Sequence, residues 1–192
     1  MASLTAFLSF AFLTAFTPGP NNIMALTLAG TYGFRKGFRF CLGVFFGFVG
    51  VMSACALFDA ALFHLLPAVE PVMKAVGAAY ILWLAWTVFR SSGDTSRFLP
   101  ANSVRAGMTL QFVNPKVILY GITAFSSFVF PWTDSPFAVI FFIGLLSAIG
   151  FAGTCCWALC GSAFQRLFNT YRTPLNSLMA LLLVWCAVSL FR

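Results

Sequence analysis

The run TPGPNN, residues 17–22, interrupts an apolar segment that extends from Leu4 to Gly30. Its prolines and glycine remove backbone donors and break a helix at a depth where no water can replace the lost hydrogen bonds. Inside a membrane, such a break is tolerated only where protein or a water-filled cavity surrounds it. A helix broken near the bilayer midplane therefore predicts a binding site in a transporter.

The composition of the whole chain indicates a membrane protein. Of its 192 residues, 61% are hydrophobic and 8% are charged, whereas soluble domains have about 25% charged residues. This length accommodates roughly six spans of ~20 residues, so we expect a single membrane transport domain over residues 1–192. Met1 to Phe16 has neither a basic leader region nor a cleavage site, and we expect it to be retained. The net charge of +7 is dispersed over short loops, which argues against a nucleic-acid partner.

The predicted fold is an all-α integral membrane protein with six transmembrane helices. Clusters of glycine, proline and charged residues separate the apolar runs and mark the breaks between helices. The expected spans are residues 4–30, 38–63, 68–90, 104–130, 136–162 and 174–192. The expected breaks are at residues 33–37, 67–71, 91–94, 131–136 and 166–174.

The cationic side chains are divided unevenly between the two faces of this arrangement. The first, third and fifth loops share one face, and the only acid among them is Asp94. Their cations are Arg35, Lys36, Arg39, Arg90, Arg97, Arg105, Arg166 and Arg172. Cytoplasmic loops collect lysine and arginine, so we expect both termini to lie outside the cytoplasm.

The two halves of the chain are similar in sequence. The run AAYILWLAWTVFR at 78–90 aligns without a gap with ALLLVWCAVSLFR at 180–192. The first and fourth spans are both interrupted by proline and asparagine, the fourth at Asn114-Pro115-Lys116. An odd number of spans in each half reverses the orientation of the second half. We therefore predict two inverted three-helix repeats, at about 1–92 and 103–192, an arrangement found in many secondary transporters.

The residues at the two breaks have the chemistry needed to bind an amino acid. A helix that resumes after Pro20 leaves free amides at its positive dipole end, which can hold a carboxylate. Asn21 and Asn22 add amide groups for a ligand, or they satisfy carbonyls freed by the kink. A charge at mid-span, such as that of Lys116, costs ~2.5–3.5 kcal/mol and indicates function. Lys116 is expected to pair with a substrate carboxylate or relay protons, unless it snorkels or caps helix carbonyls.

The ammonium end of an amino acid needs an acceptor, and no acid lies at mid-span. Asn114 and Tyr120 are candidate acceptors, while Asp59 is either a coupling residue for protons or a solvated helix end. No cofactor, metal site or enzyme chemistry is predicted, because nucleotide-binding and metal-ligand motifs are missing from the sequence. The expected substrate site consists of Thr17, Pro18, Gly19, Pro20, Asn21, Asn22, Gln111, Asn114, Pro115, Lys116 and Tyr120, with Lys116 and Asp59 as coupling candidates.

Small residues recur at helical spacing in the second span. Gly43, Gly47 and Gly50 form one face and predict close packing against another helix. The six cysteines all lie within apolar runs, which is typical of buried cysteine used as a small apolar residue.

The paired interruptions resemble the signatures of a known family. The run at 17–22, followed by the basic loop from Gly33 to Gly37, is similar to the amino-terminal signature of the LysE/RhtB amino-acid exporters. Asn114-Pro115-Lys116 resembles the second signature of the family. Within it, the runs LQFVN at 110–114, ILYG at 118–121 and FQRLF at 164–168 most resemble the branch that exports cysteine and O-acetylserine.

The resemblance implies a proton-driven antiporter that exports small neutral amino acids, such as cysteine or O-acetylserine, by alternating access. It would lie in the lipid bilayer of the bacterial inner membrane as a multi-pass protein, with both termini on the periplasmic side. A homodimer is compatible with the sequence.

Two other functions are open at this stage. Thiol-redox relatives in the same superfamily carry a cysteine beside the proline of each half, where this chain has Asn21, Asn22 and Asn114. The vicinal pair Cys155-Cys156 has no matching partner in the first half. A structural membrane protein is the third alternative, and it does not explain a lysine at mid-span.

Overall fold

The computed structural model describes residues 3–90 and 104–191, with the backbone alone for residues 60–69. The expectation of an all-α fold is confirmed for this part of the chain. Its elements are α1 (Leu4–Phe16), α2 (Pro20–Tyr32), α3 (Phe34–Arg90), α4 (Val104–Val113), α5 (Pro115–Ala124), the π-helical turn η2 (Phe125–Val129), α6 (Pro136–Ala163), α7 (Gln165–Thr170) and α8 (Arg172–Ser189).

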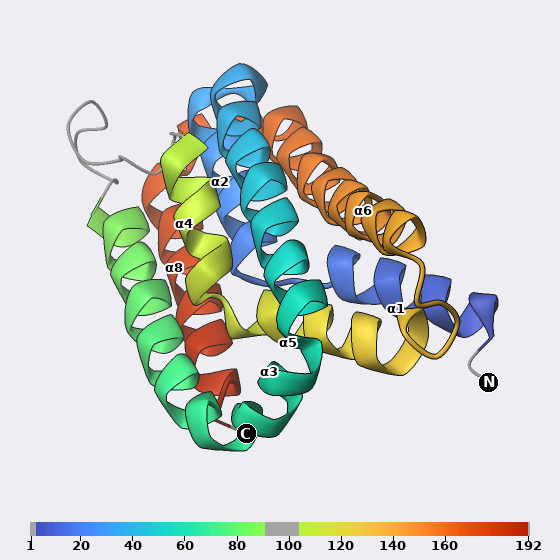
Figure 1. Cartoon of the computed structure of the whole chain (residues 1–192). Helices are drawn as coiled ribbons and strands as arrows, with labels where there is room; N and C mark the ends of the chain where they lie inside the picture. Colours follow the sequence, from blue (N-terminus) through green and yellow to red (C-terminus); the bar gives the residue numbers. More distant parts are fainter. Residues whose placement is uncertain (1–2, 91–103, 192) are drawn as a thin grey trace.

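Most of the helices form an upright bundle, from which α1 and α5 diverge. Figure 1 shows α2, the two arms of α3, α4 and α8 running side by side, with α6 leaning against them. In the same view α1 and α5, continued by η2, point together away from the bundle. Aromatic rings join these two segments, because Phe10 of α1 lies 5.3 Å from Tyr120 and 5.5 Å from Phe128 between ring centroids.

Both predicted helix interruptions are confirmed at the expected residues. α1 ends at Phe16, Gly19 has an extended backbone with φ −170° and ψ 174°, and α2 begins at Pro20. α4 ends at Val113, and Pro115 begins α5 after one non-helical residue. The axes of α4 and of α5 with η2 differ by 66°. Proline suits the first turn of each resumed helix, because its missing N–H would have had no partner there.

The described helices account for four or five membrane spans by length and hydropathy. Those long and apolar enough are Phe34–Asp59, Glu70–Arg90, Pro136–Ala163 and Arg172–Ser189, and the bent pair α4 and α5–η2 makes a fifth. α1 is apolar but short. These lengths fit a membrane protein, while six spans in two inverted repeats stay a prediction.

The expected loop at residues 67–71 is wrong. The helical backbone continues through this region from Phe34 to Arg90, and the non-helical dihedral angles are at Phe58, with φ −116° and ψ 18°. Figure 1 shows the chain reversing direction between the two arms of α3. Pro71 lies inside this helical stretch, so it does not end the helix as expected. The break expected at 91–94 lies outside the described residues.

The predicted glycine face of the second span is confirmed as a close helix contact. A Cβ atom on Gly43 would lie 2.0 Å from the carbonyl oxygen of Val104 in α4. From the other side, a Cβ atom on Gly107 would lie 2.3 Å from the carbonyl oxygen of Phe40. The backbones of α3 and α4 therefore touch, which fixes α4 and the break that follows it against the bundle.

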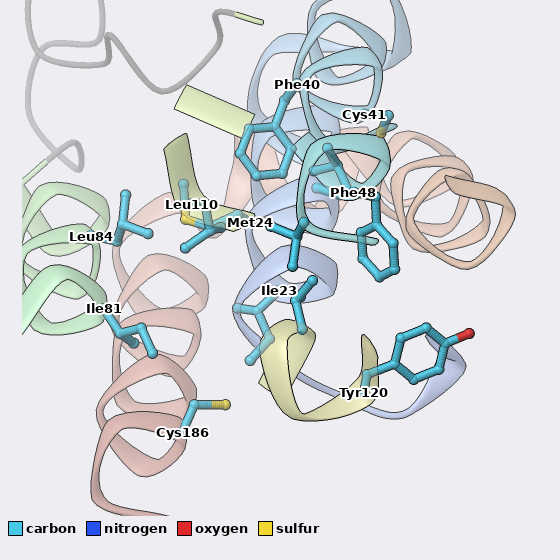
Figure 2. Packing of buried hydrophobic residues seen from close by; sticks show 14 of the residues in the cluster. Ile23, Met24, Phe40, Cys41, Phe48, Ile81, Leu84, Leu110, Tyr120 and Cys186 are labelled. Carbon is cyan, nitrogen blue, oxygen red and sulfur yellow. The ribbon is translucent and has the colours of Figure 1, made fainter. Parts of the chain in front are cut away.

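Apolar side chains from five helices fill the space between the upright helices. Figure 2 shows Met24 of α2, Phe40 of α3 and Leu110 of α4 converging in this core, with Cys186 of α8 below them. The expectation of buried cysteines is right for Cys41, Cys55 and Cys186, whereas Cys156 and Cys160 are exposed and Cys155 is half-buried on α6. These cysteines lie on a part of α6 that the other described helices do not cover.

Cationic side chains gather at one end of the bundle. Figure 1 shows the end of α2, the start of α3, the end of its second arm and the start of α4 at this end. α7 joins them, since the Phe168 ring packs against Gly30 of α2. The described cations on these segments are Arg35, Lys36, Arg39, Arg90, Arg105, Arg166 and Arg172. Arg97 and Asp94 lie outside the described residues.

Candidate functional site

The two helix breaks meet in the interior of the protein. Asn21, in the first turn of α2, and Gln111, in the last turn of α4, form a reciprocal pair of amide hydrogen bonds. Asn21 Nδ2 donates to Gln111 Oε1 at 2.7 Å, and Gln111 Nε2 donates to Asn21 Oδ1 at 3.1 Å. Asn114 Nδ2 donates to the same Asn21 oxygen at 3.4 Å. These three side chains are buried, and together they join the break at 17–19 to the break at 114.

Lys116 links the two breaks a second time. Its Nζ donates to the hydroxyl oxygen of Thr17 at 2.9 Å and to the carbonyl oxygen of Thr17 at 3.3 Å. Gly19 leaves room for the ammonium, since a Cβ atom there would lie 3.2 Å from Nζ. The lysine thus caps a carbonyl at the end of α1, as one interpretation of the sequence expected. Within the described residues no carboxylate pairs with it.

Asn22 stabilises the first break. Its Nδ2 donates to the carbonyl oxygens of Ala15 and Thr17, each at 2.9 Å, and the Thr154 hydroxyl donates to its Oδ1 at 3.5 Å. Its amide donors therefore satisfy carbonyls that the end of α1 leaves without helical partners. This is the structural role that the sequence left open for the asparagines.

The amino-terminal ends of α2 and α5 differ in how they are capped. Asn114 caps α5, because its Oδ1 accepts from the backbone N–H of Lys116 at 3.1 Å. Gly19 caps α2 without a side chain, and only the N–H of Ile23 reaches the Gly19 carbonyl, at 2.9 Å. The backbone N–H groups of Asn21 and Asn22 are left without partners in the described part of the chain. Free amides at a helix start attract anions.

These groups surround a small cavity of about 30 Å³. Residues of the breaks that line it are Gly19, Pro20, Asn21, Asn22, Asn114, Lys116 and Tyr120, and neighbours from other helices include Phe48, Gly150 and Thr154. A volume of at least about 10–15 Å³ holds one water molecule, so the cavity accommodates little more than that. The conformation described is therefore closed around the site.

Tyr120 supplies an unpaired polar atom at this cavity. Its side chain is 3% exposed, and its ring lies between Phe10, stacked at 5.3 Å, and Phe48, edge-on at 5.8 Å. Figure 2 shows the tyrosine projecting from α5 with its hydroxyl away from the apolar core. This hydroxyl is buried and has no hydrogen-bond partner among the described residues. Buried polar groups usually have a partner, so a bound molecule or water is expected there.

The other predicted residues occupy supporting or separate positions. Gln111 orients Asn21 through the bonds described above, Thr17 binds Lys116, and Pro115 begins α5. Pro18 is exposed at the surface of the first break. Asp59 does not line this cavity: it ends the first arm of α3, and its Oδ1 is buried without a partner among the described residues.

Two cavity residues were missed from the sequence. Thr154 is a polar residue within the apolar run of α6, and that contrast was a usable signal. Phe48 is one of 25 phenylalanines, and nothing in its local sequence distinguishes it.

Comparison with known proteins gives one consistent family. The sequence matches the profile of the LysE type translocators over residues 12–192. It is 47% identical over 189 residues to the cysteine/O-acetylserine efflux protein of Salmonella typhi, with 98% of this chain and 97% of the relative covered. The protein of the same name from Escherichia coli K12 is 46% identical over 190 residues, with the same coverage.

No solved structure matches the chain. The resemblance noted from the two helix breaks is confirmed, since both breaks lie within the matched region and the relatives are those of the expected branch. The chain belongs to the family of LysE type translocators.

Proposed function

We propose that this protein exports small neutral amino acids, such as cysteine or O-acetylserine, across the bacterial inner membrane. The observation that carries the proposal is the Lys116 ammonium, which lies between two helix breaks without a carboxylate partner in the described residues. Beside it, the first turn of α2 presents free amides. The names of the relatives support the substrate class.

A substrate carboxylate would bind to the backbone amides of Asn21 and Asn22 and to the Lys116 ammonium. It would replace Thr17 as the partner of the lysine, giving an ion pair in place of hydrogen bonds to a neutral hydroxyl and carbonyl. The Tyr120 hydroxyl is the nearest unpaired acceptor for the substrate ammonium, because it lines the same cavity. The hydrogen bonds among Asn21, Gln111 and Asn114 would hold the two breaks together.

Transport then requires the closed cavity to open on each side in turn. The paired segments α1 and α5–η2 would move as one unit, with the breaks at 17–19 and 114 as hinges. The cationic end of the bundle would face the cytoplasm, which puts both termini on the periplasmic side. Protons would drive export, with Lys116 and Asp59 as the coupling candidates.

Efflux from proteoliposomes tests this function. Purified protein is reconstituted with labelled cysteine, O-acetylserine, serine or lysine, and the release of each is followed with and without a proton gradient. Uphill movement of cysteine or O-acetylserine under the gradient is expected, with lysine as the cationic control. A protein that moves none of them against their gradients would contradict the proposal.

Replacing Tyr120 with phenylalanine separates binding from folding. Tyr120→Phe removes an unpaired buried hydroxyl, so the folded protein should be at least as stable as the wild type. The same change removes the acceptor for the substrate ammonium and should raise the KM for export about tenfold. Tyr80→Phe, on the second arm of α3, is the matched control and should leave the KM unchanged. An unaltered KM in Tyr120→Phe would remove the tyrosine from the site.

A cysteine-free variant tests the thiol-redox alternative. The buried thiols of Cys41 and Cys55 donate to the carbonyl oxygens of Thr154 and Ile118, and neither cysteine lines the cavity. Replacing all six cysteines with alanine should leave more than about half of the export rate, because each change is small. The measurement is efflux normalised to the amount of folded protein. Complete loss of transport in a well-folded cysteine-free variant would favour the redox function.

A further inference from the structure

A second and larger cavity lies beside the closed one. Its volume is about 450 Å³, and it is bounded by α1, α5, the end of α8 and the start of the second arm of α3. Thr14, Lys116 and Tyr120 line both cavities. The two cavities therefore meet at these side chains, and the larger one is in the size range of small-molecule sites.

The wall of the larger cavity includes an ion pair within α3. Glu70 and Lys74 are one turn apart on α3, and their charged atoms are 2.8 Å apart. The Lys74 side chain is 28% exposed and that of Glu70 is 37% exposed. An ion pair of this kind on a helix surface contributes little to stability, so stability gives little reason for it.

The charges around the larger cavity match those of an amino acid. Lys116 and Lys74 are cations, and Glu70 is the one acid among the described residues that line it. The geometry points to Glu70 as the ligand of the substrate ammonium at a second station, where Lys116 holds the substrate carboxylate. This assignment rests on the proposed function and adds to it the acid that a zwitterionic substrate requires.

Lys74 has a different part in this arrangement. While the cavity is empty it neutralises Glu70, and an exposed lysine can leave that pair for water at low cost. When an amino acid enters, its ammonium replaces that of Lys74. A molecule that has a carboxylate but no ammonium cannot replace Lys74, so Glu70 would select zwitterions over simple carboxylates.

The position of the cavity indicates its place in the transport path. Glu70 and Ser189 lie at the end of the bundle where Figure 1 shows the C-terminus and the reversal of α3, away from the cationic end. With that cationic end in the cytoplasm, the larger cavity is the periplasmic station. A substrate would pass from the closed cavity to the larger one while its carboxylate stays bound to Lys116.

Comparison of Glu70→Gln with Lys74→Gln tests this station. Both variants break the same ion pair, so any effect of the pair on folding is common to them. Cysteine export is measured in proteoliposomes, with 3-mercaptopropionate, the analogue without the amino group, as competitor. Glu70→Gln should raise the KM for cysteine about tenfold and bring the competitor within a few-fold of cysteine. Lys74→Gln removes the competitor for Glu70, so it should lower the KM for cysteine and keep the discrimination.

Each outcome shows whether Glu70 binds the substrate ammonium or only forms a structural ion pair with Lys74. The second station would be overturned by equal KM values for the two variants, or by unchanged discrimination between cysteine and 3-mercaptopropionate in Glu70→Gln. In that case, export by the wild-type protein would still uphold the proposed function. Absence of export by the wild-type protein would overturn both. If neither single variant folds, the exchange of the two charges, Glu70→Lys with Lys74→Glu, restores the ion pair. That variant should fold and lose the preference for the zwitterion, and retention of the preference would refute the role of Glu70.

Discussion

Lys116→Met should abolish amino-acid export while the protein accumulates in the membrane at its normal level. Methionine keeps the length and apolar stem of lysine and removes the charge. A charge at mid-membrane costs about 2.5–3.5 kcal/mol, so its loss should not weaken the fold. The substrate carboxylate, however, would lose its only cationic partner at the closed cavity. We expect the export rate to fall at least about 100-fold, as for the loss of a charged hydrogen-bond partner in a buried site.

The measurement is efflux of labelled cysteine from proteoliposomes containing equal amounts of folded protein. Lys36→Met is the matched control, because that lysine is exposed at the cationic end of the bundle and lines neither cavity. It should export at close to the wild-type rate. Export by Lys116→Met at that same rate would show that the lysine only caps the Thr17 carbonyl, as it does in the closed conformation.

Gly43→Ala should prevent assembly of the bundle. The added Cβ atom would lie 2.0 Å from the Val104 carbonyl oxygen, which is backbone and cannot turn aside. α4 would have to move outward, and Gln111, which holds Asn21, would move with it. Overpacking of this kind costs typically about 1–3 kcal/mol, and contact with rigid backbone places this change at the upper end.

Thermal unfolding in detergent, with the yield of monodisperse protein, measures the effect of Gly43→Ala. Gly144→Ala on α6 is the matched control, since nothing lies within 4 Å of its added Cβ atom. Alanine favours a helix over glycine by roughly 0.5–1 kcal/mol, so this variant should be slightly more stable than the wild type. Equal stability of the two variants would mean that α3 and α4 are not in backbone contact.

The parts of the fold that depend on local chemistry were predictable from the sequence. Proline and glycine act on their own turn of helix, so both breaks were found at 17–22 and 114–116. The glycine face of Gly43 was predictable for a similar reason, because its spacing follows the helical repeat. The loop expected at 67–71 is wrong, because the helical backbone continues through Pro71 and its non-helical angles are at Phe58 instead.

The candidate site was only partly predictable, because its contacts join residues far apart in the chain. The sequence named Asn21, Gln111 and Lys116 correctly as residues at the breaks. It did not give the amide pair between Asn21 and Gln111, which are 90 positions apart. Glu70 was not among the site residues named from the sequence, and its position on a cavity wall follows from the reversal of α3, which no short motif encodes.

The unequal capping of α2 and α5 has a thermodynamic consequence for the transport cycle. Among the described residues, two amides at the start of α2 and a tyrosine hydroxyl have no partner, and the cavity beside them has space for little more than a water molecule. In the proposed scheme, a bound amino acid would satisfy all three groups together. The loaded carrier would then be the relaxed state and the empty one the strained state, so the protein alone would carry the energetic cost of the return of the empty carrier.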